Sequence, residues 1–233
     1  MTLPHDVICL PWWRQPSFAM VLVLAISLAL YPFADVAHWL HQLVQLLDIV
    51  AILMIVRVLR HSPVIFQSGW IISLPLMVAQ IAFMIAPKSS SIALVLHALQ
   101  VVFHGFAALA LMSYVLRDYI ITLDELFAIA AVYILLALMW ASAYAVVLQL
   151  DASAIFINPS NNPKNYVSFA DLVYYSMTTL TSTGYGEITP VSPAARALSM
   201  LQQWLGVMFV AIVIARLTSL YRPTDTNSET PKK

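Results

Sequence analysis

The chain has 233 residues, of which 61% are hydrophobic and only 9% are charged. Because a soluble domain carries about 25% charged residues, most of this surface is not made for water. The formal net charge is +0, without a basic or acidic block, so we expect no nucleic-acid partner. Cys9 is the only cysteine, which excludes an intrachain disulfide and a cysteine-based metal site.

Six apolar stretches dominate the chain, and a helix that crosses the hydrocarbon core needs about 20 predominantly apolar residues. The first stretch is similar to the apolar core of a signal peptide, but only Arg14 precedes it and no clear cleavage site follows, so we interpret it as a helix. The predicted spans are residues 18–34, 37–60, 69–86, 91–116, 125–149 and 194–220.

The basic residues predict how the chain is oriented in the membrane. If both termini are cytoplasmic, eight basic residues lie inside and three outside, which agrees with the positive-inside rule. The inside set is Arg14, Arg57, Arg60, Arg117, Arg216, Arg222, Lys232 and Lys233, and the outside set is Lys88, Lys164 and Arg196. The small size favours, by analogy alone, the inner (plasma) membrane of a bacterium.

The long connector between the fifth and sixth spans, residues 151–192, contains an apolar segment too short to cross the membrane. Segments of 10 to 14 apolar residues are often re-entrant. Ser168 can cap a helix there, and Asp171 follows three residues later, where a carboxylate favours the positive end of the helix dipole. We therefore predict a short helix over 169–181 that enters the membrane and stops halfway.

The residues after this half-helix, Thr181 to Glu187, read TSTGYGE. Non-helical backbone at membrane depth is tolerated where it is buried or lines a water-filled path. A ring of backbone carbonyls from four such strands can replace the hydration shell of a potassium ion. Successive carbonyls face one axis if the backbone alternates with left-handed positions, and Gly184 and Gly186 can adopt these without steric cost. Tyr185 is expected to turn its ring away from the axis, toward Tyr174 and Tyr175.

Residues 175–190, YSMTTLTSTGYGEITP, resemble the pore signature of the potassium-channel superfamily. The resemblance covers about residues 125–220 and implies an outer helix, a pore helix, a selectivity filter and an inner helix. The family's filter reads Thr-Val-Gly-Tyr-Gly-Asp, so this chain departs from it at Ser182, Thr183 and Glu187. The resemblance implies potassium selectivity. Because of the three departures, it does not imply the family's filter rigidity or its inactivation behaviour.

The resemblance also assigns expected roles along the pore segment. Filter residues that bind K+ are Ser182, Thr183, Gly184, Tyr185 and Gly186, and residues that support the filter are Tyr174, Tyr175, Thr178 and Glu187. Gly206 is a candidate hinge of the inner helix, or it allows close helix packing. Gln202 and Gln203 are expected to hydrogen-bond behind the filter. Expected cavity-lining residues are Val207, Val210, Ala211 and Ile214, where a hydrophobic constriction can gate by dewetting.

Upstream of the pore, four predicted helices occupy the place of a voltage-sensing domain. Such domains carry arginines at every third position of the fourth helix, but residues 91–116 contain no Lys or Arg. Arg57 and Arg60 have this spacing, yet positive-inside anchoring explains them more simply. Asp48 lies inside a span, with His41 as its candidate partner. With His97 and His104, these two residues form either a cluster that responds to pH or a set of polar groups that hydrogen-bond to one another between packed helices.

The sequence therefore predicts an all-α membrane protein with six transmembrane helices, a re-entrant pore helix and a filter loop, assembled as a tetrameric channel. The expected parts are a cytoplasmic N-terminus (1–17), a four-helix domain (18–117), a pore domain (118–220) and a cytoplasmic tail (221–233). We expect passive K+ conduction without enzyme activity or cofactor, a homotetramer in the lipid bilayer, and an unknown gating partner. A non-selective cation channel and a non-conducting regulatory subunit stay open as alternatives.

Overall fold

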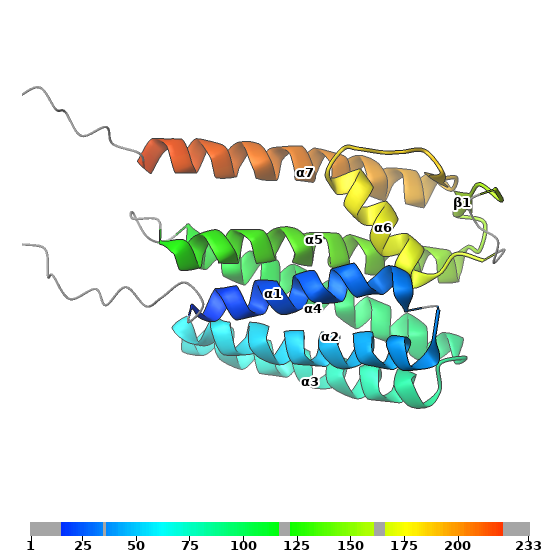
Figure 1. Cartoon of the computed structure of the whole chain (residues 1–233), viewed down its shortest axis with the longest axis horizontal. Coiled ribbons are helices and arrows are strands. Elements are labelled where there is room, and N and C mark those ends of the chain that lie inside the picture. The colour runs from blue at the N-terminus through cyan, green and yellow to red at the C-terminus, as the bar shows by residue number, and fades with distance from the viewer. Residues whose placement is uncertain (1–14, 35, 117–121, 161–165, 221–233) are drawn as a thin grey trace, which may run out of the picture.

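A computed structural model describes residues 15–34, 36–116, 122–160 and 166–220 of the chain. Six long helices run side by side, and one short helix crosses at an angle between two of them (Figure 1). The long helices are α1 (Pro16–Leu30), α2 (His38–Val58), α3 (Pro63–Ile85), α4 (Ser90–Val115), α5 (Leu123–Leu150) and α7 (Pro193–Leu220); the short one is α6 (Phe169–Leu180). Each long helix is apolar and long enough to cross a bilayer, which confirms the predicted fold class of a multi-pass all-α membrane protein.

The observed spans agree with the predicted ones except at the start of the third. That helix begins at Pro63, whereas the predicted span, residues 69–86, begins six residues later. Proline is well suited to the first turn of a helix, because its fixed φ matches that of a helix and because an N–H group at this position would have no intrahelical partner. Pro63 therefore begins α3 rather than ending a connector, while Pro75 lies within the same helix.

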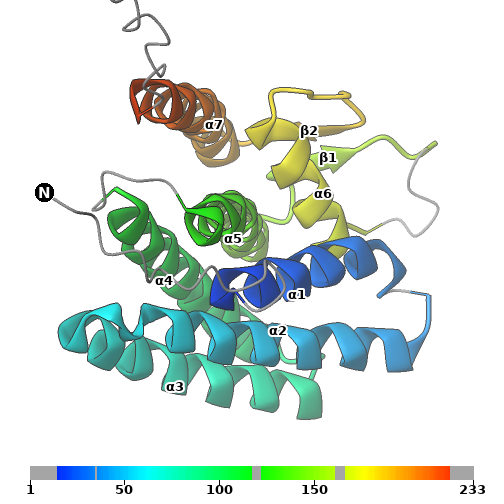
Figure 2. The same cartoon turned by 60° about the vertical axis from the view of Figure 1, so that its left-hand side comes forward.

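Helix α5 is the centre of the arrangement. Figure 2 shows α1 to α4 on one side of α5, and α6 and α7 on the other. Helices α1, α4, α6 and α7 all pack against it. Its first turn is fixed by a capping box, in which Thr122 accepts from the Glu125 amide and Glu125 accepts from the Thr122 amide. Helix α5 thus contacts helices on both of its sides, α1 and α4 on one and α6 and α7 on the other.

The start of α1 is tied to the start of α5 by one buried carboxylate. The backbone N–H and the hydroxyl of Ser17 each donate to Asp124, both at 3.0 Å. A carboxylate at the N-terminal end of a helix satisfies free amide groups and favours the positive end of the helix dipole. Asp124 therefore fixes α1 against the pore-side helix at this end of the bundle.

Two short strands were not predicted. Strand β1 (Ile155–Ile157) pairs antiparallel with β2 (Ile188–Pro190), with Phe156 opposite Thr189. The sequence gives little sign of them, because each has three residues and more than 30 residues separate the partners. Their pairing joins the segment after α5 to the segment after the expected filter, at the right-hand end of the molecule in Figure 1.

Candidate ion-conduction site

The short helix α6 has the position and the ends that the sequence predicts. Ser168 accepts a hydrogen bond from the amide of Asp171, and Asp171 accepts from the amide and the hydroxyl of Ser168. This capping box fixes where the helix begins. The helix ends at Leu180, within one residue of the predicted end, and buries Leu172, Val173, Tyr175, Ser176, Thr179 and Leu180. At 12 residues it is too short to cross a bilayer.

The backbone after α6 alternates in handedness. Gly184 and Gly186 have φ of 51° and 91°, as the filter hypothesis requires, and Ser182 also has a positive φ of 58°. Ser182 is the only described non-glycine residue with a positive φ. Thr183 and Tyr185 each lie between two residues with left-handed backbone. Left-handed backbone costs a residue with a side chain about 1–2 kcal/mol. The sequence did not indicate this conformation at Ser182, since serine is not a residue that favours it.

The end of α6 holds the start of this loop through backbone hydrogen bonds. The carbonyl of Thr178 accepts from the amides of Thr183 at 2.8 Å and Gly184 at 3.2 Å. The Thr179 carbonyl accepts from the Ser182 amide at 3.0 Å. These bonds occupy carbonyls that a helix end leaves without partners, and they fold the loop back along α6. Thr178, expected to support the filter, thus contacts the loop through its main-chain carbonyl.

Two aromatic rings hold the other end of the loop. Tyr185 stacks on Tyr174 with ring centroids 6.3 Å apart and ring planes 2° apart. A hydrogen bond with Glu187 raises the pKa of Tyr174 to about 12. The expected contact of Tyr185 with Tyr174 is therefore confirmed. The ring of Tyr175 instead packs against Tyr144, 5.0 Å away on α5, because it lies on the buried face of α6.

The loop is uncovered in the single chain. Tyr185 is 71% exposed, and a Cβ placed on Gly184 or Gly186 would meet no atom within 4 Å. The inner-helix residues Val207, Val210 and Ile214 are also exposed. Both sets belong to the side of the chain formed by α6 and α7 in Figure 2.

Comparison with known proteins decides the family. The pattern of a family described as "Ion channel" matches residues 121–222, which include α5, α6, the loop and α7. Protein LctB from Bacillus caldotenax is 30% identical over 98 residues, covering 41% of this chain and 72% of that protein. The chain belongs to the ion channel family. It is a member of the potassium-channel superfamily, as the segment 175–190 indicated. No solved structure matches the chain.

Behind the loop of this channel, Gln202 connects three helices. Its amide nitrogen donates to the Ser176 carbonyl at 2.9 Å and to the Ser176 hydroxyl at 2.8 Å, and its Oε1 accepts from Tyr144 at 2.7 Å. Ser176 donates to the carbonyl of Ala137 on α5 at 2.6 Å. The expectation that Gln202 forms hydrogen bonds in this region is confirmed, whereas Gln203 is exposed.

A second set of hydroxyl groups in the channel lies next to Gln202. The hydroxyl oxygens of Tyr175 and Ser199 are 2.7 Å apart, and those of Tyr144 and Ser199 are 3.2 Å apart. Tyr144, Ser176 and Ser199 were not among the predicted site residues. The signal that could find them is a hydroxyl side chain within an apolar helix, because such groups need a partner in the membrane.

Gly206 allows close packing between the inner helix and the end of α6. A Cβ at this position would lie 2.1 Å from the carbonyl oxygen of Leu180. No side chain fits there, so packing alone explains this glycine. Helix α7 runs from Pro193 to Leu220, and the hinge role of Gly206 stays a prediction.

The polar residues upstream of the pore have other partners than predicted. Asp48 accepts from the hydroxyl of Tyr31 at 2.7 Å, while His41 contacts the amide nitrogen of Gln45 at 3.0 Å. The predicted pairing of Asp48 with His41 is therefore wrong, because Tyr31 at the end of α1 is packed against α2. His97 bonds to Gln100 at 2.9 Å, so the histidines do not satisfy one another.

Proposed function

We propose that the protein is a potassium-selective channel subunit that conducts K+ passively through the carbonyls of residues 182–186. The observation that carries the proposal is the alternation of φ at Ser182, Gly184 and Gly186. Alternating handedness turns successive carbonyls to one side of the strand, as a carbonyl-lined filter requires. Ser182 adds a hydroxyl at the inner end, and the third filter residue Gly184 is followed by Tyr185, which leans on the pore helix.

Helix α6 supports this assignment through its direction. Its carboxyl end leads directly into the loop, and the negative end of a helix dipole favours a cation. The dipole effect is largest where water is excluded, which is where a dehydrated ion needs it most. The chain thus offers the ion both backbone oxygens and a favourable helix end.

Four copies are needed to surround an ion, since one chain supplies one loop. The uncovered loop and the exposed apolar residues of α7 support a homotetramer in which these surfaces meet. We place both termini in the cytoplasm and the protein in a bacterial inner membrane, on the distribution of its basic residues. The absence of Lys and Arg from α4 supports gating by a stimulus other than voltage.

Flux through liposomes tests the proposal. The purified protein is reconstituted into vesicles loaded with potassium, and ion flux and reversal potential are measured in potassium and in sodium. We expect selective potassium flux that Gly184→Asp abolishes, because the substitution places a charged side chain at a left-handed position of the loop. The control is Ser90→Asp, which adds the same charge at an exposed residue in the first turn of α4, outside the pore segment, where a carboxylate is favourable.

Three other outcomes would contradict the proposal. Equal flux of sodium and potassium would identify a non-selective cation channel, for which the departures Thr183 and Glu187 would be the first positions to revert. Absence of flux from a tetrameric, folded protein would favour a non-conducting regulatory subunit. Flux that persists in Gly184→Asp would show that ions do not pass through this loop.

A further inference from the structure

A cavity of about 390 Å³ lies outside the pore, between helices α2, α3 and α4 and the start of α6. Its lining includes the exposed residues Pro87 and Tyr166, which lie at the same end of the bundle as the strands. Asp48, in the middle of α2, lies deeper. This volume is within the range of small-molecule sites, which are about 300–1,000 Å³. None of the functions proposed above uses it.

Two buried amides line this cavity without full hydrogen bonding. Gln45 is 5% exposed and Gln80 is 2% exposed, and the Oε1 atoms of both have no hydrogen-bond partner in the described part of the chain. The amide nitrogen of Gln45 is used by His41, so its oxygen is the group left over. A buried acceptor without a donor is costly, and most native proteins avoid it. A ligand with N–H groups would remove the cost at both positions.

Asp48 adds a carboxyl group to the same lining. One of its oxygens, Oδ2, accepts from Tyr31, and the described residues of the lining include no Lys or Arg that would compete with a cation for this group. Gln45 and Asp48 are three residues apart on α2 and therefore share one helix face. The cavity thus combines a carboxylate with two free amide oxygens.

We propose that this cavity binds a small organic cation, a protonated primary amine. An ammonium group carries three donors, which matches the acceptors of Asp48, Gln45 and Gln80 in number, and its positive charge favours the ionised form of Asp48 in the complex. The aromatic rings of Tyr31, Phe83 and Phe169 offer apolar and cation-attracting surface for the carbon chain. A metal ion fits less well, since the described residues contain no group of three side chains suited to hold one.

The cavity also reaches the pore helix. Phe169, the first residue of α6, stacks on His97 with centroids 4.9 Å apart and meets Tyr31 edge-on at 5.6 Å. A ligand in the cavity therefore touches the residue with which the pore helix begins. Where the channel function proposed above holds, occupancy changes potassium flux through this contact.

Binding is tested on the full chain in detergent, without any measurement of flux. The probe is n-butylammonium chloride, with n-butanol as its uncharged counterpart, and isothermal calorimetry gives the affinity. We expect saturable binding of butylammonium, weaker by at least about tenfold in Asp48→Asn and Gln80→Met, in line with the loss of a charge-assisted hydrogen bond. Gln149→Met is the matched control, because Gln149 also has an unpartnered buried amide oxygen but does not line the cavity.

Three results would overturn the proposal: no saturable binding to the folded protein, equal binding of butanol, or butylammonium binding that Asp48→Asn and Gln80→Met leave unchanged. The last would place the amine elsewhere, including the pore. If Asp48→Asn does not fold, Gln80→Met decides alone, because it keeps the contact of Asp48 with Tyr31. If butylammonium binds but does not change potassium flux, the cavity is a binding site without a link to the pore. If butylammonium binds but the protein conducts no potassium, the result counts against the channel proposal only.

Discussion

Gly206 and Gly105 are both helical glycines, but their surroundings differ in a way that substitution can reveal. A Cβ at Gly206 would meet the Leu180 carbonyl at 2.1 Å, which is backbone and cannot move aside. A Cβ at Gly105 would meet the sulfur of Met139 at 3.2 Å, the flexible part of a side chain. Gly206 is thus fixed by its neighbour on α6, whereas Gly105 is not.

We expect Gly206→Ala to lower the stability of the folded protein by about 1–3 kcal/mol, the usual cost of overpacking. The end of α6 would be pushed away from α7, so potassium flux should fall as well. Gly105→Ala should be close to neutral, because alanine favours a helix by up to about 1 kcal/mol over glycine and Met139 can adjust. Thermal unfolding in detergent measures both, and equal effects of the two substitutions would contradict the packing argument.

The hydroxyl of Tyr174 can be tested apart from its ring. Tyr174→Phe keeps the stack on Tyr185 but removes the hydrogen bond with Glu187. We expect lower steady potassium flux, because the outer end of the loop loses one of its two ties to α6. The raised pKa of Tyr174, about 12, means that this bond is fully present below the ordinary tyrosine pKa of about 10 and is lost as the pH rises through 12. The difference between the two proteins should therefore persist at pH 7 and pH 9.

Among single residues, the sequence predicted left-handed backbone at the glycines of the loop but not at Ser182. Glycine is identifiable in advance because it alone enters left-handed backbone freely. Serine adopts it here because local backbone bonds to the carbonyls of Thr178 and Thr179 close the turn, and main-chain bonds leave no signal in the sequence. Asp48 is a different case, since its partner Tyr31 lies outside α2, whereas the predicted partner His41 was chosen from helical spacing alone.

Helices α5, α6 and α7 are held together by polar side chains rather than by apolar packing alone. Within the membrane, a hydroxyl or amide group has no water to satisfy it, so interhelical hydrogen bonds contribute to association. Gln202 makes three such bonds, to Ser176 twice and to Tyr144. Its neighbour Gln203 is exposed and lies outside this network.

We expect Gln202→Leu to destabilise the protein by about 1–3 kcal/mol, the cost of leaving a buried donor or acceptor without a partner. Gln203→Leu should have little effect on stability, because it removes an exposed group. The midpoint of thermal unfolding compares the two variants. A loss of similar size in both would show that the amides act through helix propensity or lipid contact rather than through the network behind the loop.

At the level of elements, the sequence predicted α6 well because its start has a local signal. Ser168 and Asp171 form a capping box that requires only their own spacing. The strands β1 and β2 have no such signal, since their pairing depends on two segments that meet only after α5, α6 and α7 are packed. Helix α3 lies between these cases. Its first residue, Pro63, is a local signal for a helix start, but the apolar pattern alone predicted a start at residue 69.

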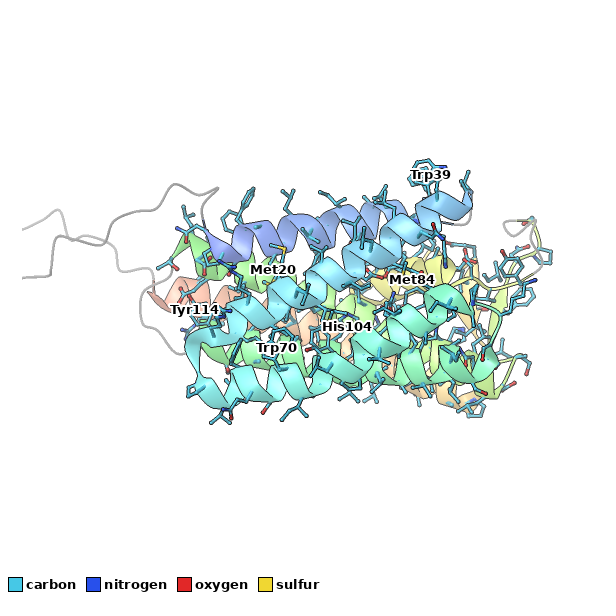
Figure 3. All side chains as sticks on the ribbon, turned by 90° about the horizontal axis from the view of Figure 1, so that it is seen from below. Met20, Trp39, Trp70, Met84, His104 and Tyr114 are labelled. Carbon is cyan, nitrogen blue, oxygen red and sulfur yellow. The ribbon has the colours of Figure 1, made fainter. Side chains whose placement is uncertain are left out.

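The whole molecule presents two exposed tryptophans with different expected surroundings. Trp204 lies on α7 and is 66% exposed, while Trp39 is 64% exposed and projects from the outer end of α2 in Figure 3, away from the centre of the bundle. In the proposed tetramer, α7 faces the other subunits, and α2 faces lipid near the membrane surface, where tryptophan is common. The oligomeric state of two matched tryptophan variants tests both assignments.

We expect Trp204→Ala to convert tetramers into smaller species, because a large aromatic residue at an interface contributes far more than its neighbours to association. Trp39→Ala removes the same side chain from a surface that meets lipid, so the tetramer should remain. Native mass spectrometry in mild detergent measures both, with four times the 25.9 kDa mass of one chain expected for the unmodified protein. If Trp39→Ala dissociated the assembly and Trp204→Ala did not, the subunits would meet through the four-helix domain instead, and the loops at residues 182–186 could not surround one ion.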